Sequence, residues 1–100
     1  MNGRNMGRLL LNLRYANNAV PVKDAKVVLY NSSGNALGEY LTDVDGKTPE
    51  ISVPVGEYAV NILADGFVET DFIGIPIAEG TLTLQTLQLF PLYNYSSEVV

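Results

Sequence analysis

The sequence contains no cysteine and no histidine. Without cysteine, disulfide bonds cannot contribute to the stability of the chain. Without histidine, the chain lacks the side chain that most often titrates near neutral pH, which is also the commonest ligand of transition metals. The two absences together exclude a structural zinc site. We therefore expect a protein that needs neither a metal nor a cofactor.

The same absences remove most routes to catalysis. A nucleophilic hydrolase needs an activated side chain beside a base, and only serine, threonine and lysine remain for these roles. Ser32 and Ser33 fall in a turn, and no Gly-x-Ser-x-Gly segment is present. A glycosidase needs two carboxylates across a cleft, whereas nearly all the acidic residues here fall in turns. We expect a protein that is not an enzyme.

Basic residues are few. Lysine and arginine together number 6 against 11 aspartate and glutamate residues, which gives a net charge of −5. Binding to nucleic acid needs clustered lysine and arginine that neutralise phosphates. Arg4, Arg8 and Arg14 make the N-terminus locally basic but are too sparse for this role, so we expect no nucleic-acid partner.

Long apolar runs are also missing. After Arg4 and Arg8, the apolar run Leu9-Leu10-Leu11 is too short for the core of a signal peptide. No segment approaches the ~20 apolar residues that a membrane-spanning helix needs, so we expect no membrane insertion. We expect synthesis in the cytoplasm without a signal peptide, followed by entry into a virion or cell envelope through assembly or release.

What the chain does contain is a series of short segments in which apolar and polar residues alternate. An alternation with a period of two is typical of β-strands, and clusters such as residues 31–35 and 43–46 are typical of turns. About seven such strands without helical periodicity predict an all-β fold, a single Greek-key β-sandwich. The predicted strands cover residues 9–15, 25–30, 37–42, 51–55, 58–64, 73–77 and 82–89.

The predicted sandwich domain covers residues 8–92, with an N-terminal arm over residues 1–7 and a C-terminal tail over residues 93–100. Neither terminal segment carries a core pattern. Segments of this kind can become ordered on a neighbouring molecule, so we expect both to contact a partner. The competing interpretation is that they are frayed termini.

The last strand has an irregular pattern. Leu82 and Leu84 share one parity, whereas Leu87 and Leu89 share the other, so a regular strand cannot direct all four to one face. A β-bulge near residues 85–86 would solve this by inserting one residue, and we favour it. The alternative is that both faces of the strand are partly covered.

Other strands give predictions about the core and the edges. Pro54 cannot donate a ladder hydrogen bond, so residues 51–55 are expected at an edge or in an irregular strand. The first strand, residues 9–15, carries few charges, and proteins either blunt uncharged edges or use them for binding. The residues predicted to be buried between two sheets are Leu11, Leu13, Val27, Leu29, Val60, Ile62 and Leu89.

Three motifs, in order along the chain, resemble those of a known family. Residues 21–27 resemble the P-x-x-x-A-x-V opening of carboxypeptidase regulatory-like domains, residues 42–48 resemble their T-D-x-x-G hairpin, and residues 54–67 resemble P-x-G-x-Y-x-L-x-V-x-A-x-G-Y. These domains have a transthyretin-like, prealbumin-type β-sandwich. The resemblance implies structural rather than catalytic roles for Pro21, Ala25, Asp43, Gly46, Gly56, Tyr58, Gly66 and Phe67.

A narrower resemblance lies in residues 45–51 and 80–92, which look like modules attached to Gram-positive spore cortex-lytic and peptidoglycan-binding proteins. In those proteins the module accompanies a separate enzyme, which has no counterpart in this sequence. The resemblance therefore implies a stand-alone module, as in small cell-envelope or bacteriophage structural proteins.

Two special chemistries are expected to be absent. Asp43 and Asp45 begin like a calcium loop, but the full frame of oxygen ligands is missing, so Asp43 is expected to support its hairpin through side-chain-to-backbone hydrogen bonds. Sandwich adhesins with a related fold form a Lys–Asn isopeptide bond, which needs a buried acid four residues after the tyrosine that opens the long strand. Ile62 holds that position here.

These observations predict a non-enzymatic structural or interaction module, such as a component of a bacteriophage virion or a cell-envelope assembly, that binds a protein partner or itself. The alternative is a peptidoglycan- or carbohydrate-binding module that holds cell-wall glycan through exposed aromatic side chains. The candidate contact residues are Tyr30, Tyr40, Tyr93 and Tyr95, for which half-buried strand packing is the competing interpretation.

Overall fold

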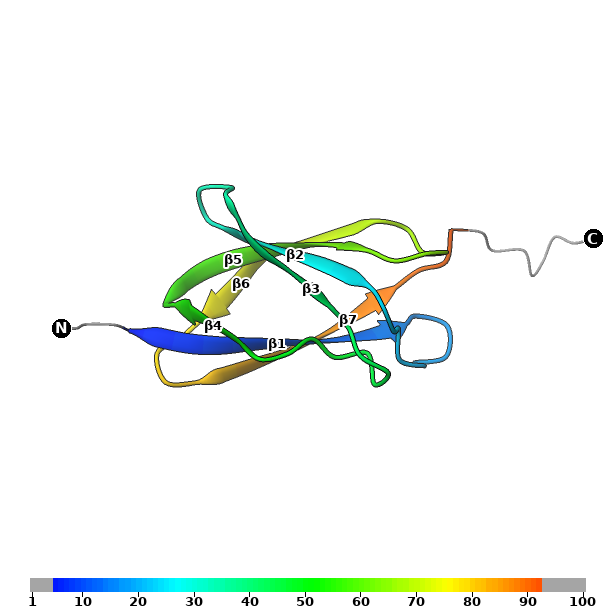
Figure 1. Ribbon diagram of the computed structural model, residues 1–100, viewed down its shortest axis with the longest axis horizontal. Coiled ribbons are helices and arrows are strands. Elements are labelled where there is room, and N and C mark those ends of the chain that lie inside the picture. The colour runs from blue at the N-terminus through cyan, green and yellow to red at the C-terminus, as the bar shows by residue number, and fades with distance from the viewer. Residues whose placement is uncertain (1–4, 93–100) are drawn as a thin grey trace, which may run out of the picture.

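A computed structural model describes residues 5–92, which form seven β-strands and no helix. The strands lie in two layers, a sheet of three strands and a sheet of four (Figure 1). The predicted all-β sandwich of about seven strands is confirmed. The strands are β1 (Met6–Tyr15), β2 (Lys26–Asn31), β3 (Ala36–Leu41), β4 (Ile51–Pro54), β5 (Gly56–Leu63), β6 (Thr70–Ile77) and β7 (Leu82–Leu89).

The two sheets differ in strand direction. The three-stranded sheet has the order β4-β1-β7, in which β1 runs antiparallel to β4 and parallel to β7. The four-stranded sheet has the order β3-β2-β5-β6, and all its neighbours are antiparallel. Parallel neighbours need a long crossover connection, and here the chain between β1 and β7 supplies the whole opposite sheet.

The described residues include no helix that could cross a membrane.

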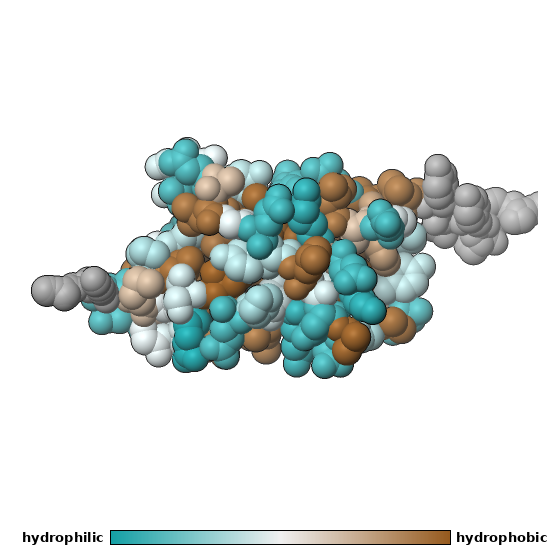
Figure 2. Space-filling model, viewed as in Figure 1, coloured by the Kyte–Doolittle hydropathy of each residue, from teal (hydrophilic) through white to brown (hydrophobic). Residues whose placement is uncertain are grey.

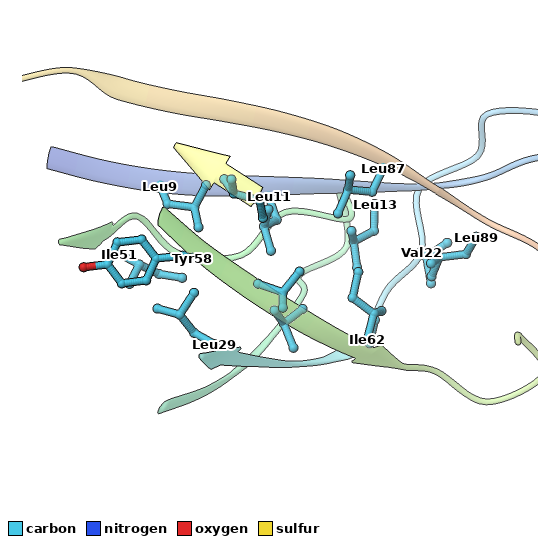
Figure 3. Packing of buried hydrophobic residues seen from close by; sticks show 14 of the residues in the cluster. Leu9, Leu11, Leu13, Val22, Leu29, Ile51, Tyr58, Ile62, Leu87 and Leu89 are labelled. Carbon is cyan, nitrogen blue, oxygen red and sulfur yellow. The ribbon is translucent and has the colours of Figure 1, made fainter. Parts of the chain in front are cut away.

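The core is a single apolar layer between the two sheets. Because side chains alternate along a strand, β1 directs Leu9, Leu11 and Leu13 inward, where each is fully buried. Across the layer lie residues of β2 and β5, among them Leu29 and Ile62 (Figure 3). The predicted core is confirmed, since no member is more than 1% exposed: Leu11, Leu13, Val27, Leu29, Val60, Ile62 and Leu89.

The β-bulge expected near residues 85–86 is wrong. All of β7 pairs with β1 in one continuous register. Leu82 and Leu84 lie on the outer face of the sheet, 42% and 58% exposed, whereas Leu87 and Leu89 are buried. The pattern misled because only the second half of β7 supplies apolar side chains to the core, while the first half carries its leucines on the outside.

A bulge does occur in β6. The register of β5 and β6 shifts between Tyr58 and Val60, where the single residue Ala59 faces both Ile73 and Gly74. Gly74 has a φ of 71°, which glycine adopts without strain. The extra residue turns Ile73 outward, where it is 80% exposed, although the sequence alternation groups it with the two buried isoleucines that follow.

The first strand is central rather than at an edge. β1 pairs with β4 on one side and with β7 on the other, so its low charge reflects burial of one face and not an available edge. β1 already begins at Met6, and Gly7 is buried, so part of the N-terminal arm predicted over residues 1–7 belongs to the sheet. The predicted C-terminal tail, with Tyr93 and Tyr95, lies outside the described residues.

The edge predicted from Pro54 is confirmed, because β4 is an outer strand of its sheet. The N–H of Val55 donates to the carbonyl of Asn5 at 2.9 Å, which places the odd-numbered residues of this strand toward β1. The even-numbered residues, Ser52 and Pro54, therefore direct their backbone groups away from the sheet. Proline at such a position removes no hydrogen bond from the ladder.

We expect the substitution Ile62→Ala to lower the free energy of unfolding by about 2–5 kcal/mol, because it leaves a cavity in the buried layer. For a domain of this size the thermal midpoint should fall by at least about 8 °C. Leu63→Ala is the matched control, since Leu63 follows Ile62 on the same strand but is 45% exposed. Equal midpoints for the two variants would contradict the assignment of faces.

Candidate functional site

The two described tyrosines among the predicted contact residues lie on opposite faces of the four-stranded sheet. Tyr40 pairs with the buried Val27 and packs against the core from the edge strand β3. Its ring lies over Gly38, where an added Cβ would be 2.9 Å from the tyrosine hydroxyl. Tyr30 has the opposite parity in β2 and is half-buried on the outer face. The two tyrosines therefore do not form one aromatic surface: Tyr30 lines a groove of about 690 Å³ on the outside of this sheet, whereas Tyr40 lines a separate, smaller one of about 270 Å³.

This outer groove has a volume of about 690 Å³ and is formed by β2, β5, β6 and the turn after β2. Its shape follows from the strand register. Ala59 is paired with Tyr30 on one side and faces Ile73 and Gly74 on the other, so a small side chain lies between two large ones. The volume lies within the range of sites that bind small ligands.

The outer groove combines apolar and acidic groups. Glu57 and Asp71 contribute carboxylates, and no lysine or arginine is among the lining residues. The Nδ2 atom of Asn61 donates to Asp71 Oδ1 at 2.7 Å and to Glu69 Oε2 at 2.8 Å. These bonds fix the amide between two negative charges. Beside them Ile73 reaches into solvent, so the groove offers apolar contact and hydrogen-bond acceptors together.

Ile73 is the residue that sequence reasoning missed. On the face of the molecule that Figure 2 shows, apolar side chains reach the surface in several separate places among hydrophilic ones. Ile73 has the largest exposed fraction among the exposed large hydrophobic residues of the described range. The signal that could have revealed it is Gly74, because a glycine inside a strand pattern often marks a bulge that reverses the facing of its neighbours.

Asp43 has the structural role that was predicted for it. Its Oδ1 atom accepts hydrogen bonds from the N–H of Asp45 at 2.9 Å and of Lys47 at 3.0 Å. The bond from Lys47 is the main reason that the pKa of Asp43 lies below its usual value. Gly46 completes the turn with a φ of 78°, and an added Cβ would lie 2.5 Å from the carbonyl oxygen of Leu13. This loop therefore holds the chain against β1.

Two buried threonines hold further backbone groups near β1. Thr42 Oγ1 donates to the carbonyl of Val22 at 2.7 Å and accepts from the N–H of Ala25 at 2.9 Å. Thr48 Oγ1 accepts from the N–H of Leu11 at 3.0 Å. Apart from the hydroxyl of Tyr58, these are the only buried polar side chains over residues 5–92. The described core thus contains no lysine, asparagine or acid from which an isopeptide bond could form.

The remaining motif residues fix strand ends. The hydroxyl of Tyr58 donates to the carbonyl of Pro54 at 2.6 Å, and burial raises the pKa of this tyrosine. Phe67 packs edge-on against Tyr15, with ring centroids 5.4 Å apart. Among the described residues, no group of three or more histidine, cysteine, aspartate or glutamate side chains is arranged to hold a metal ion. Pro21, Gly56 and Gly66 lie in connections or at the start of a strand.

No family model matches the sequence, and neither does any curated protein. Solved structures do match it in fold. The TIE protein of Bacillus anthracis is 20% identical with a TM-score of 0.72, over 86% of this chain and 17% of that protein. The minor pilin GBS52 of Streptococcus agalactiae is 18% identical with a TM-score of 0.70, over 90% of this chain and 46% of the pilin.

A third similar structure is the 5-hydroxyisourate hydrolase of Klebsiella pneumoniae, which is 16% identical with a TM-score of 0.61, over 84% of this chain and 90% of the enzyme. Identities this low show the fold alone. The chain is a transthyretin-like β-sandwich, as the three sequence motifs implied. It spans less than half of the length of the first two proteins that it resembles.

We expect acid to weaken the loop that Asp43 organises. Because the pKa of Asp43 in the folded protein is lowered from 3.8, its contribution to stability is present above that value and is lost as the pH falls through the folded pKa. Asp43→Asn keeps an oxygen acceptor but removes the charge. The thermal midpoint of the variant should therefore fall less than that of the parent protein when the pH is lowered from about 5 to about 2.

Asp45→Asn is the control for this experiment, because it removes the same charge two residues away and leaves both hydrogen bonds to Asp43 in place. It should follow the parent protein as the pH is lowered. If Asp43→Asn and the parent show the same dependence of midpoint on pH, the structural role of the Asp43 carboxylate is refuted.

Proposed function

We propose that the chain is a non-enzymatic interaction module that binds a protein partner within a larger assembly, such as a cell-envelope structure or a bacteriophage virion. The observation that carries this proposal is Ile73, which the bulge in β6 holds 80% exposed beside the outer groove. Full burial of an isoleucine side chain contributes about 1.5–3 kcal/mol. A partner that covers Ile73 therefore gains binding energy from a side chain that contributes little to the fold itself.

The chemistry of the outer groove indicates what the partner presents. Within the outer groove, Tyr30 and Ile73 lie on either side of the small residue Ala59, and together they can contact an apolar side chain of the partner. Glu57 and Asp71 make the lining negative, with no basic residue to neutralise it. We propose that the partner places an apolar side chain over Ala59 in the outer groove and a lysine or arginine beside the carboxylates of Glu57 and Asp71.

The similar structures support an assembly role, but the proposal does not depend on them. The fold is shared with a minor pilin, and equally with a hydrolase, so the function depends on the site and not on the fold. The lining of the outer groove contains no histidine, cysteine or lysine, which leaves the hydroxyl of Ser32 without a customary base. This composition favours binding over catalysis.

The segments that flank the sandwich belong to the same proposal. Residues 1–4 and 93–100 would add contacts to the assembly beyond those of the outer groove. The protein would reach a virion or an envelope structure after synthesis in the cytoplasm. Association with a spore cortex-lytic or other cell-wall lytic system would be one such setting.

A second candidate function is binding of cell-wall glycan in the same groove. It is favoured by the position of Tyr30 on the same face as the amide of Asn61 and the carboxylate of Asp71. A sugar ring packs its apolar face against an aromatic ring, while its hydroxyl groups bond to amide and carboxylate groups.

A photo-crosslinking amino acid at position 73, introduced in the cells from which the sequence comes, distinguishes these functions. We expect a covalent adduct with one discrete protein. Position 44 is the control: Val44 is exposed as well (66%), but it lies in a turn and is not part of the groove lining, so it should give no such adduct. Tyr30→Ala should weaken the adduct. A glycan adduct in place of a protein adduct would favour the second function, and equal adducts from positions 73 and 44 would contradict both.

A further inference from the structure

The free edge of β7 is a second feature that the outer groove does not explain. The N–H of Arg8 donates to the carbonyl of Thr81, and the N–H of Ala16 donates to that of Leu89, both at 2.9 Å. Since both backbone groups of a strand residue point to the same side, the odd-numbered residues of β7 face β1. The even-numbered residues direct their N–H and carbonyl groups outward, and over residues 5–92 no other strand pairs with them.

This free edge has a defined end. The carbonyl of Phe90, which continues the even-numbered series, accepts from the N–H of Val68 at 2.8 Å. The loop that carries Val68 thus covers the edge just beyond β7. The uncovered positions are Leu82, Leu84, Thr86 and Gln88.

The other three edges of the sandwich are blunted in ways that β7 is not. β4 has 4 residues and ends in Pro54. β3 carries a register shift and the charged Glu39. β6 contains the bulge at Gly74 and also Pro76. β7 has 8 residues, LTLQTLQL, with no charge, proline, glycine or bulge, which is the kind of edge that adds a further strand.

We propose that the β7 edge pairs with β7 of a second copy of this chain, antiparallel and about a two-fold axis, so that the two three-stranded sheets become one continuous sheet. Among the edges of the described chain, only β7 itself matches this edge in length and regularity, which is why the occupant is a second copy. A two-fold contact of this kind uses the same surface on both copies and closes as a dimer.

The sequence of β7 is compatible with this self-pairing. With the axis at Gln85, Leu84 lies opposite Thr86 of the second copy and Leu82 lies opposite its Gln88, and each such pair exchanges two backbone hydrogen bonds. All of these side chains lie on the outer face, where Leu82 and Leu84 are exposed. The new neighbours cover part of that apolar area, and no like charges meet.

Light scattering after size-exclusion chromatography of the full chain, over a wide range of concentrations, tests the proposal. We expect the mass to rise from monomer to dimer with concentration. Thr86→Pro removes an outward N–H without touching the ladder to β1, so it should remain a monomer at every concentration with its strand content intact. Thr86→Lys, which adds a charge at the same edge, is the second variant if the proline variant does not fold.

Two controls separate the edge from side effects. Ser52→Pro removes an outward N–H from β4, the opposite edge of the same sheet, and should dimerise like the parent. Thr86→Val keeps the N–H but loses the hydroxyl, which lies 3.5 Å from Asn12 Nδ2, and should also dimerise. A parent that stays monomeric at the highest concentration, or a Thr86→Pro or Thr86→Lys variant that dimerises like the parent, would overturn the proposal. This inference does not rest on the outer groove, so the position-73 adduct and the dimer can fail separately.

Discussion

The burial of one face of β1 is the constraint on which the rest of the structure depends. Leu9, Leu11 and Leu13 have no exposed surface, and β1 lies between β4 and β7 in its own sheet and beneath the opposite sheet. Every buried backbone group of this strand then needs a partner. On one side β7 pairs with β1 from Arg8 to Tyr15, and on the other side β4 pairs only with the start of β1, from Met6 to Leu9.

The loop that precedes β4 completes that second side of β1. The N–H of Leu13 donates to the carbonyl of Gly46 at 2.7 Å, and the N–H of Leu11 reaches Thr48 Oγ1. Gly46 and Thr48 therefore present loop atoms directly to β1. Thr42 and Asp43 act one step away, because they hold backbone groups of the neighbouring loop segments. Of the structural motif residues, Gly46 meets this requirement directly, because its carbonyl accepts from the N–H of Leu13.

The sequence pattern was sufficient for the fold class and the core, because both follow from alternation along single strands. Val27, Val60 and Ile62 could be assigned to the core without knowing which strands pair. Sheet order could not be predicted in the same way, since alternation does not distinguish a central strand from an edge strand. The low charge of β1 predicts an edge strand, whereas β1 is central and the edge without charge, proline, glycine or bulge is β7.

The candidate site was less predictable for a related reason. Alternation along β2 separates Tyr30 from the core residues Val27 and Leu29, but the place of Tyr40 against the core depends on the pairing of the weakly patterned strand β3 with Val27. Ile73 became visible only through a bulge that depends on the conformation of Gly74. The two proposed contact surfaces lie in different sheets, so one molecule can pair through β7 and still bind a partner in the outer groove.

Amide hydrogen exchange, measured residue by residue along β7, tests the central claim that β1 is covered and β7 is the open edge. In dilute solution the amides of Thr83, Gln85 and Leu87 should be protected by β1, while those of Leu84 and Thr86 should exchange rapidly. At high concentration the second set should become protected as well. Uniform protection along β7 in dilute solution, or rapid exchange of the odd-numbered amides, would contradict this account of the sheet.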